Sequence, residues 1–243
     1  MIAEATSEKG LRTLGIIPAR GGSKGVPRKN IKHLAGRPLL EYTVASALQV
    51  RGLARVIVST DDQAIADCAL ACGADVPFLR PATLAQDGSP TVPVLQHAVI
   101  ECERTDGPYD AICLLQPTCP FRSPGLVDRC LERLVESAAD TVMTVEQVPH
   151  SYHPDWVFVP ADGTLRVSTG LDAPTPRRQD LSKAFARTGS VYVVRRDTLM
   201  KGNTLYGRRV AGVETPQGAT INIDTLEDWQ RAEERALEES GRA

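Results

Sequence analysis

The chain has 243 residues, 42% of them hydrophobic and 24% charged, which suits one large α/β domain or two small ones with a sizeable core. A formal net charge of −2 excludes general basicity as a means of recruiting nucleic acid, so any phosphate binding must come from a local cluster of cations. We see no signal peptide, no run of about 18 apolar residues and no CxxC pair among the six cysteines, so we expect a cytoplasmic protein without membrane contact.

The first half of the chain alternates strand and helix patterns. Residues 14–18 form a short apolar run that predicts a buried strand, and a glycine-rich basic loop follows it. Pro38 then opens a helix at a position that tolerates proline. Residues 56–59 predict the next strand, and Thr60 to Gln63 resemble a capping box in front of another helix.

The alternation continues along the chain. Residues 76–79 are strand-like, residues 89–102 have helical spacing, residues 111–115 predict a strand and residues 123–135 a helix. Such a series favours a three-layer α/β sandwich with a mostly parallel sheet. In open sheets of this kind ligands bind beyond the carboxyl ends of the strands, where the polar loops of this sequence fall.

The pattern changes after about residue 140. Short strand-like pieces at 156–159, 165–168 and 191–195 are separated by proline and glycine, which indicates a β-rich excursion at about 145–190. The chain ends in a helix after a second capping box at 225–228, and we expect its apolar residues to face the sheet: Leu226, Trp229 and Leu237. We interpret residues 1–10 as a flexible tail and 11–243 as one domain with this inserted subdomain.

The segment Ala19–Asn30 has the strongest chemical pattern. Its glycines let backbone N–H groups approach a ligand, and four of its residues are cations: Arg20, Lys24, Arg28 and Lys29. The segment is neither a Walker A loop nor a GxGxxG loop. Because it follows a buried strand directly, we interpret it as a triphosphate cradle rather than as a solvated basic turn.

The segment Ile16–Leu40 resembles the opening of the acylneuraminate cytidylyltransferases, the enzymes that make CMP-sialic acid and its legionaminic and pseudaminic relatives. The resemblance covers about residues 12 to 236, and the further matching segments occur in the order of the family: 58–61, 79–82, 114–120, 178–180, 189–192 and 223–225. It implies a Rossmann-like αβα sandwich whose β-rich excursion forms a homodimer.

The resemblance also implies roles for individual residues. Arg20 and Lys24 would grip the CTP phosphates and, with Asp224, serve catalysis. The remaining CTP contacts would be Ser23, Lys29, Asn30, Arg80, Thr91 and Gln116. The acidic sugar would meet Gln116, Thr118, Arg178, Gln179 and Tyr192, in a pocket that a partner subunit completes. Mg²⁺ would be held by Asp224 and Asn222.

Elementary chemistry agrees with two of these roles. Arginine matches a carboxylate by a bidentate fork, which suits Arg178 to an acidic sugar. Magnesium takes one or two carboxylates beside phosphate oxygens, which suits Asp224. The alternatives are a helix cap for Asp224 and a solvent-exposed charge for Arg178.

Three positions depart from the family pattern. Asn222 stands where the family usually has aspartate, so the metal site loses a charge. Cys119 replaces a usual serine and Thr91 another. The alternatives for function are the same chemistry on an octulosonate or a phosphonate, or a catalytically weak nucleotide-binding protein.

Overall fold

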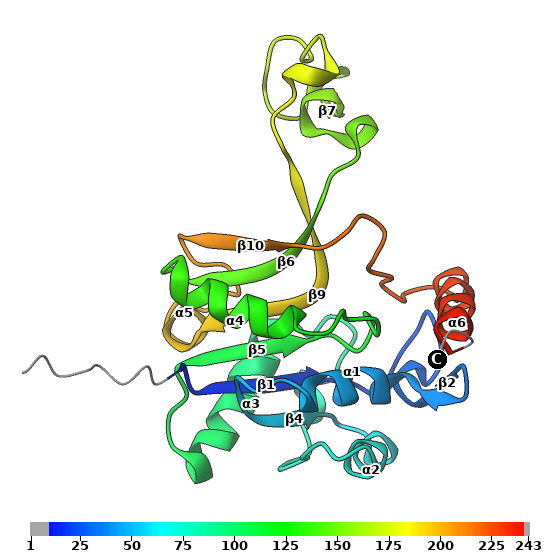
Figure 1. Ribbon diagram of the computed structural model, residues 1–243, viewed down its shortest axis with the longest axis vertical. Helices are drawn as coiled ribbons and strands as arrows, with labels where there is room; N and C mark the ends of the chain where they lie inside the picture. The colour runs from blue at the N-terminus through cyan, green and yellow to red at the C-terminus, as the bar shows by residue number, and fades with distance from the viewer. Residues whose placement is uncertain (1–9, 241–243) are drawn as a thin grey trace, which may run out of the picture.

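A six-stranded sheet forms the centre of the protein, and its strand order is β10-β6-β9-β5-β1-β4. The computed structural model describes residues 10–240, so most of the proposed tail at 1–10 lies outside the described residues (Figure 1). The strands of this sheet are β1 (Thr13–Pro18), β4 (Leu53–Ser59), β5 (Ala111–Leu115), β6 (Thr141–Gln147), β9 (Phe185–Arg195) and β10 (Val210–Glu214). Only β9 runs antiparallel to its neighbours, so the expected mostly parallel sheet is confirmed.

Helices cover both faces of the sheet, which confirms the three-layer architecture (Figure 1). One face packs against α1 (Leu39–Leu48), α2 (Gln63–Ala71) and α4 (Leu126–Glu136), and the other against α3 (Thr91–Asp106) and α5 (Arg196–Met200). Strand β1 is apolar from Leu14 onward because it is buried on both sides: Ile17 belongs to the first layer, and Leu14 and Ile16 to the second.

Three local predictions need correction. Residues 76–79 do not form a strand: isolated bridges occur at Asp75, just before them, and at Leu79. The N-cap of α2 is Asp62 rather than Thr60, because the Asp62 carboxylate accepts the N–H of Ile65 at 3.1 Å. Residues 191–195 belong to the central sheet, as the second half of the long strand β9.

The last helix, α6 (Leu226–Ser240), does not pack on the sheet as expected. Trp229 is buried, but in a cluster with Val26 of the basic loop and with Leu34 of the hairpin formed by β2 (His33–Leu34) and β3 (Arg37–Pro38). Leu226 and Leu237 are exposed. Helix α6 therefore holds the basic loop in place instead of covering the sheet.

An arm projects from the body between β6 and β9 (Figure 1). It spans residues 148–184 and contains a separate two-stranded sheet, β7 (Phe158–Ala161) and β8 (Thr164–Val167). The Trp156 indole donates to the carbonyl of Thr175 at 2.7 Å, and the ring of His153 bonds to that of Ser182 at 2.8 Å. No helix within residues 10–240 is long and apolar enough to cross a membrane.

Candidate active site

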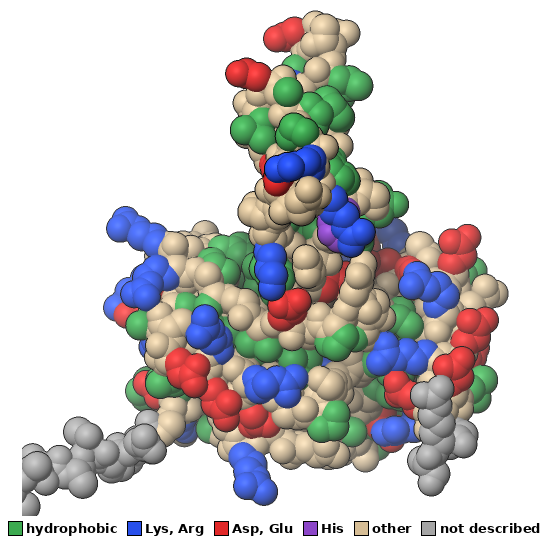
Figure 2. Space-filling model, turned by 45° about the horizontal axis from the view of Figure 1, so that its top comes forward, with side chains coloured by type: hydrophobic (Ala, Val, Ile, Leu, Met, Phe, Trp, Pro, Cys, Tyr) green, Lys and Arg blue, Asp and Glu red, His purple; other side chains and the backbone are tan. Residues whose placement is uncertain are grey.

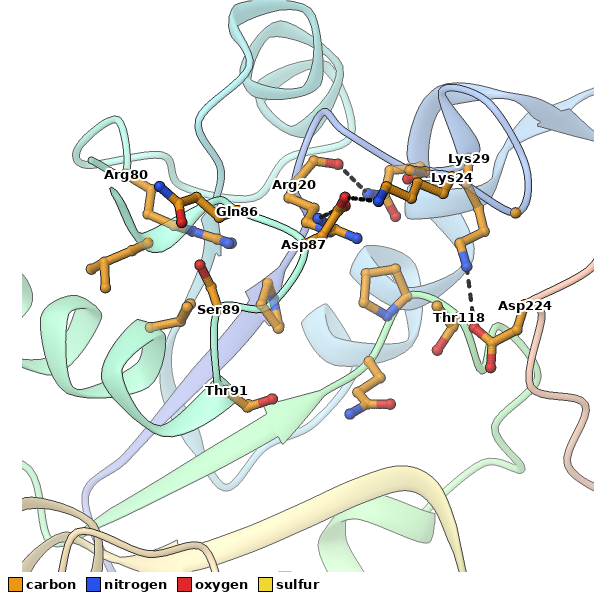
Figure 3. A pocket seen from close by; sticks show the side chains of 18 of the residues that line it. Arg20, Lys24, Lys29, Arg80, Gln86, Asp87, Ser89, Thr91, Thr118 and Asp224 are labelled. Atoms are coloured by element: carbon orange, nitrogen blue, oxygen red, sulfur yellow. Dashed lines mark hydrogen bonds and ion pairs between the residues drawn. The ribbon is translucent and has the colours of Figure 1, made fainter. Parts of the chain in front are cut away.

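A cavity of about 420 Å³ lies at the carboxyl ends of β1 and β5 (Figure 3). It brings together eleven of the residues that the sequence assigned to the site: Arg20, Ser23, Lys24, Lys29, Asn30, Arg80, Thr91, Gln116, Thr118, Asn222 and Asp224. The three others lie elsewhere: Arg178, Gln179 and Tyr192. The roles of all fourteen residues stay predictions.

Two glycines of the basic loop lie so close to neighbouring segments that no side chain would fit at their positions without a shift of the neighbours. A Cβ on Gly25 would overlap the carbonyl oxygen of Asp224, and one on Gly21 would press on the Asp62 side chain. The N–H of Gly21 donates to Asp61 at 3.1 Å. These close approaches bring the loop after β1 against the segments that carry Asp61 and Asp224.

Two loop residues act as internal ties. The buried Asn30 donates from its amide to the carbonyl of Arg20 at 3.0 Å, which fixes the two ends of the loop to each other. The Lys29 ammonium donates to the carbonyl of Ile223 at 2.6 Å and lies 3.4 Å from Asp224 Oδ1. Lys29 therefore joins the loop to the segment before α6, and it carries a positive charge to the cavity wall.

Arg80 forms the rear of the cavity and is buried. Its guanidinium donates to the hydroxyl of Ser59 at 3.1 Å and to the carbonyl of the same residue. Burial lowers the pKa of Arg80, and the Asp61 charge opposes this shift. Thr91 begins helix α3, so the positive end of that helix is directed at the same cavity.

The sugar side of the predicted site is organised by an arginine that sequence reasoning missed. Arg122 donates to the carbonyls of Gln116 at 2.7 Å and Ser190 at 3.0 Å, and to the Thr43 hydroxyl at 2.9 Å. Burial lowers the pKa of Arg122 to about 10. The residue therefore fixes the turn after β5 that presents Gln116 to the cavity.

Tyr192 and Cys119 are both buried outside the cavity wall. The Tyr192 ring belongs to the core on the α3 side, and its hydroxyl accepts a hydrogen bond from Arg187 at 2.9 Å. The Cys119 thiol lies 3.5 Å from Asn222 Oδ1 and 3.7 Å from the carbonyl of Thr188. Burial raises the pKa of Cys119, so this thiol stays neutral and fills space beside Asn222.

A second missed residue stands inside the cavity. Asp87 bonds to Arg20 at 2.6 Å and to the Lys24 ammonium, as Figure 3 shows. These two partners lower the pKa of Asp87, Lys24 first. The sequence offered no signal for it, since Asp87 is a single carboxylate in a loop far from the basic segment.

An open α/β sheet with a cation-lined cavity at the ends of its strands is typical of proteins that bind a nucleotide or another polyphosphate. The family model of the cytidylyltransferases matches residues 14–211. The chain therefore belongs to the cytidylyltransferase family.

Relatives and solved structures agree with this membership. The CMP-N,N'-diacetyllegionaminic acid synthase of Legionella pneumophila is 32% identical over 92% of this chain and 95% of its own. The N-acylneuraminate cytidylyltransferase A of Danio rerio is 33% identical over 91% of this chain and 50% of its own. A solved CMP:2-keto-3-deoxy-manno-octonic acid synthetase complexed with CTP superposes with a TM-score of 0.72 at 20% identity, covering 94% of this chain and 99% of its own, which shows a shared fold.

Proposed function

We propose that the protein transfers CMP from CTP to the anomeric hydroxyl of an acidic 2-keto-3-deoxy sugar of the N-acylneuraminate type. The observation that carries the proposal is the charge of the cavity, where four cations face two carboxylates: Arg20, Lys24, Lys29 and Arg80 against Asp87 and Asp224. Relatives named for legionaminic and N-acylneuraminic acids support the choice of sugar.

In the proposed reaction the anomeric oxygen forms a bond to the α-phosphorus of CTP. The bond from that phosphorus to the bridging oxygen of the β-phosphate breaks, pyrophosphate leaves, and the hydroxyl proton is released. Arg20 and Lys24 would bind the phosphates and stabilise the negative charge that builds up on the leaving group. Gln116, held by Arg122, would lie at the junction between nucleotide and sugar.

Magnesium fits the residues at the cavity mouth. Asp224 is an exposed carboxylate, and the side-chain nitrogen of Asn222 lies 2.5 Å from its Oδ2. Rotating the Asn222 amide by half a turn presents its oxygen instead, which gives one carboxylate and one amide oxygen beside the phosphate region. Mg²⁺ is often bound in this way, by one or two protein oxygens plus substrate phosphates. When bound, the ion would neutralise phosphate charge.

We further propose a cytoplasmic homodimer. The predicted sugar contacts Arg178 and Gln179 lie in the arm, in a short 3₁₀ turn at Arg178–Asp180. Their side chains do not line the cavity of their own chain. If the arm of one chain reached the cavity of its partner, Arg178 and Gln179 could contact the sugar there. The six free cysteines suit a reducing compartment.

A pyrophosphate-release assay with Mg²⁺ tests the proposal. CTP, UTP, ATP and GTP are each paired with N-acetylneuraminate, with legionaminate- and pseudaminate-type acids, with an octulosonate and with a phosphonate. We expect CTP to exceed UTP by about 100-fold or more, because a polar site built for one base leaves groups unpaired with another. A preference for the octulosonate or the phosphonate would show that the proposed sugar substrate is wrong, while the cytidylyl transfer itself would stand. Binding of CTP without turnover on any acid would leave only a nucleotide-binding protein.

A further inference from the structure

The two cations assigned to the CTP phosphates already share a carboxylate. Asp87 uses one oxygen for Arg20, at 2.6 Å, and the other for Lys24. Figure 3 shows it between the two basic side chains. Within residues 10–240 no other hydrogen bond to this carboxylate is present, so these two cations alone hold its position.

The segment that carries Asp87 is suited to movement between two fixed ends. Arg80, before it, is buried and bonded to Ser59, and Thr91, after it, begins helix α3. Between these ends the chain makes one 3₁₀ turn, at Ala82–Leu84, and a backbone bond from Ser89 to Gln86. A Cβ on Gly88 would meet no neighbouring atom within 4 Å. The Asp87 side chain is 43% exposed, so it can leave its partners without disturbing the core.

Carboxylate and phosphate compete for the same donors. An anion at hydrogen-bond distance from Arg20 and Lys24 would bring its charge close to Asp87, and like charges at such separations repel each other. The two cations can therefore bind CTP phosphates more tightly once Asp87 has withdrawn, because its charge no longer opposes the phosphate charge and its donors are free.

We propose that Asp87 competes with the CTP phosphates for Arg20 and Lys24, the two cations of the phosphate cradle. Asp87 is thus a positioning residue of the reaction. It holds Arg20 and Lys24 in place while the cradle is empty, withdraws when the CTP phosphates arrive, and returns to the same donors as pyrophosphate leaves. Asp87 itself forms and breaks no covalent bond, and Arg20 and Lys24 stay paired with an anion throughout the cycle. The inference rests on the proposed function, since it takes Arg20 and Lys24 as phosphate ligands.

Calorimetric titration with pyrophosphate in the absence of metal tests this competition. Asp87→Asn keeps the size of the side chain and removes its charge, so the cradle no longer has to release a bound anion. We expect pyrophosphate to bind about three- to tenfold more tightly, the range that two exposed ion pairs allow. Glu132→Gln, an equal change of charge on the exposed face of α4 and outside the cavity, should leave the affinity unchanged.

A double-mutant cycle separates competition from a general charge effect. In a Lys24→Ala background Asp87 loses one of its two partners, so the gain from Asp87→Asn should shrink. A gain of equal size in both backgrounds would mean long-range repulsion and would overturn the proposal, as would unchanged or weaker binding in the single variant. If neither wild type nor Asp87→Asn binds pyrophosphate, the phosphate cradle of the proposed function is itself wrong, whereas binding without tightening removes Asp87 alone.

Discussion

Asn222 and Asp224 contact each other at the mouth of the cavity, where a second carboxylate would face the same space. The Asn222 nitrogen lies 2.5 Å from Asp224 Oδ2, so an aspartate at position 222 would bring two carboxylates together. Hard divalent cations prefer anionic oxygens, and two adjacent carboxylates repel each other when no cation is present. In the proposed magnesium site, the residue at 222 would therefore set both the affinity for the metal and the repulsion between carboxylates when no metal is bound.

We predict that Asn222→Asp tightens Mg²⁺ binding. The half-saturating Mg²⁺ concentration in a titration of initial rate should fall. Without metal the variant should melt no higher than wild type. Added Mg²⁺ should raise the melting temperature of the variant by more than it raises that of wild type. Unchanged or higher half-saturation would show that position 222 does not face the metal, and the metal role of Asp224 would then need revision.

The residues that sequence could place belong to short motifs, and two of these motifs directly follow strands. The basic loop and the turn after β5 reach the cavity because parallel strands deliver their carboxyl ends to one edge. Asp87 and Arg122 could not be found in this way. The partners of Asp87 lie more than sixty positions earlier in the chain. Arg122 has the sequence context of an exposed loop residue, and its bond to the carbonyl of Ser190 depends on a strand 68 positions later.

At the scale of helices, the cap of α6 was predicted correctly, whereas the cap of α2 was placed at Thr60 instead of Asp62 and the buried face of α6 was predicted wrongly. The capping box of α6 forms as expected, because the Asp228 carboxylate accepts the N–H of Thr225 at 2.9 Å and the Thr225 hydroxyl accepts that of Asp228 at 3.1 Å. The face that α6 buries depends on the loop beneath it, which the helix sequence does not contain. Only residues 191–195 of strand β9 were predicted as a strand, and not as part of the central sheet, because its partners are distant in sequence. The whole arm lies between β6 and β9, and α4, β6 and the arm lie between β5 and β9.

Helix α3 is fastened to strand β4 at its C-terminal end by an acidic residue with three partners. Asp106 accepts hydrogen bonds from the Tyr109 hydroxyl, from Arg55 of β4 at 2.9 Å and from Thr105 at 2.8 Å. These contacts, Tyr109 first, lower the pKa of Asp106 to about 2 from an ordinary value of 3.8. A carboxyl whose pKa is lower in the folded protein stabilises the fold above its unfolded pKa, and the effect fades as the pH falls toward the folded value.

We predict that Asp106→Asn lowers the free energy of unfolding at pH 7 by about 1–2 kcal/mol, after allowance for partial exposure. The difference from wild type should shrink between about pH 4 and pH 2, where wild type loses the same charge. Urea denaturation at several pH values measures both effects. Asp197→Asn, which removes an exposed partner of Lys201, serves as the control and should change little. A pH-independent difference would mean that the Asp106 charge does not stabilise the fold.

At the scale of the whole molecule, the arm exposes apolar side chains that no other described part of the same chain covers. Figure 2 shows hydrophobic side chains spread over the projecting part. Large apolar residues are exposed there: Tyr152, Phe158, Leu165 and Leu171. A two-stranded sheet alone is only marginally stable in water, and apolar surface of this kind marks an interface. The sequence indicated the excursion by its broken rhythm, but the projection away from the body depends on β6 and β9 pairing at its base.

We predict that the protein is a homodimer held through the arm. Sedimentation equilibrium should give twice the chain mass of 26.2 kDa. The double variant Tyr152→Ser, Leu165→Ser changes side chains that are 71% and 66% exposed, so it should weaken association without opening the core. Because Arg178 lies in the same arm, the variant should also lose turnover on the acidic sugar while CTP still binds to the body. The matched control is Leu70→Ser, which removes a 55% exposed apolar residue from α2 and should leave both the mass and the activity unchanged. A fully active monomer, in wild type or in the double variant, would show that the arm does not join two chains and that each cavity binds its sugar without a partner.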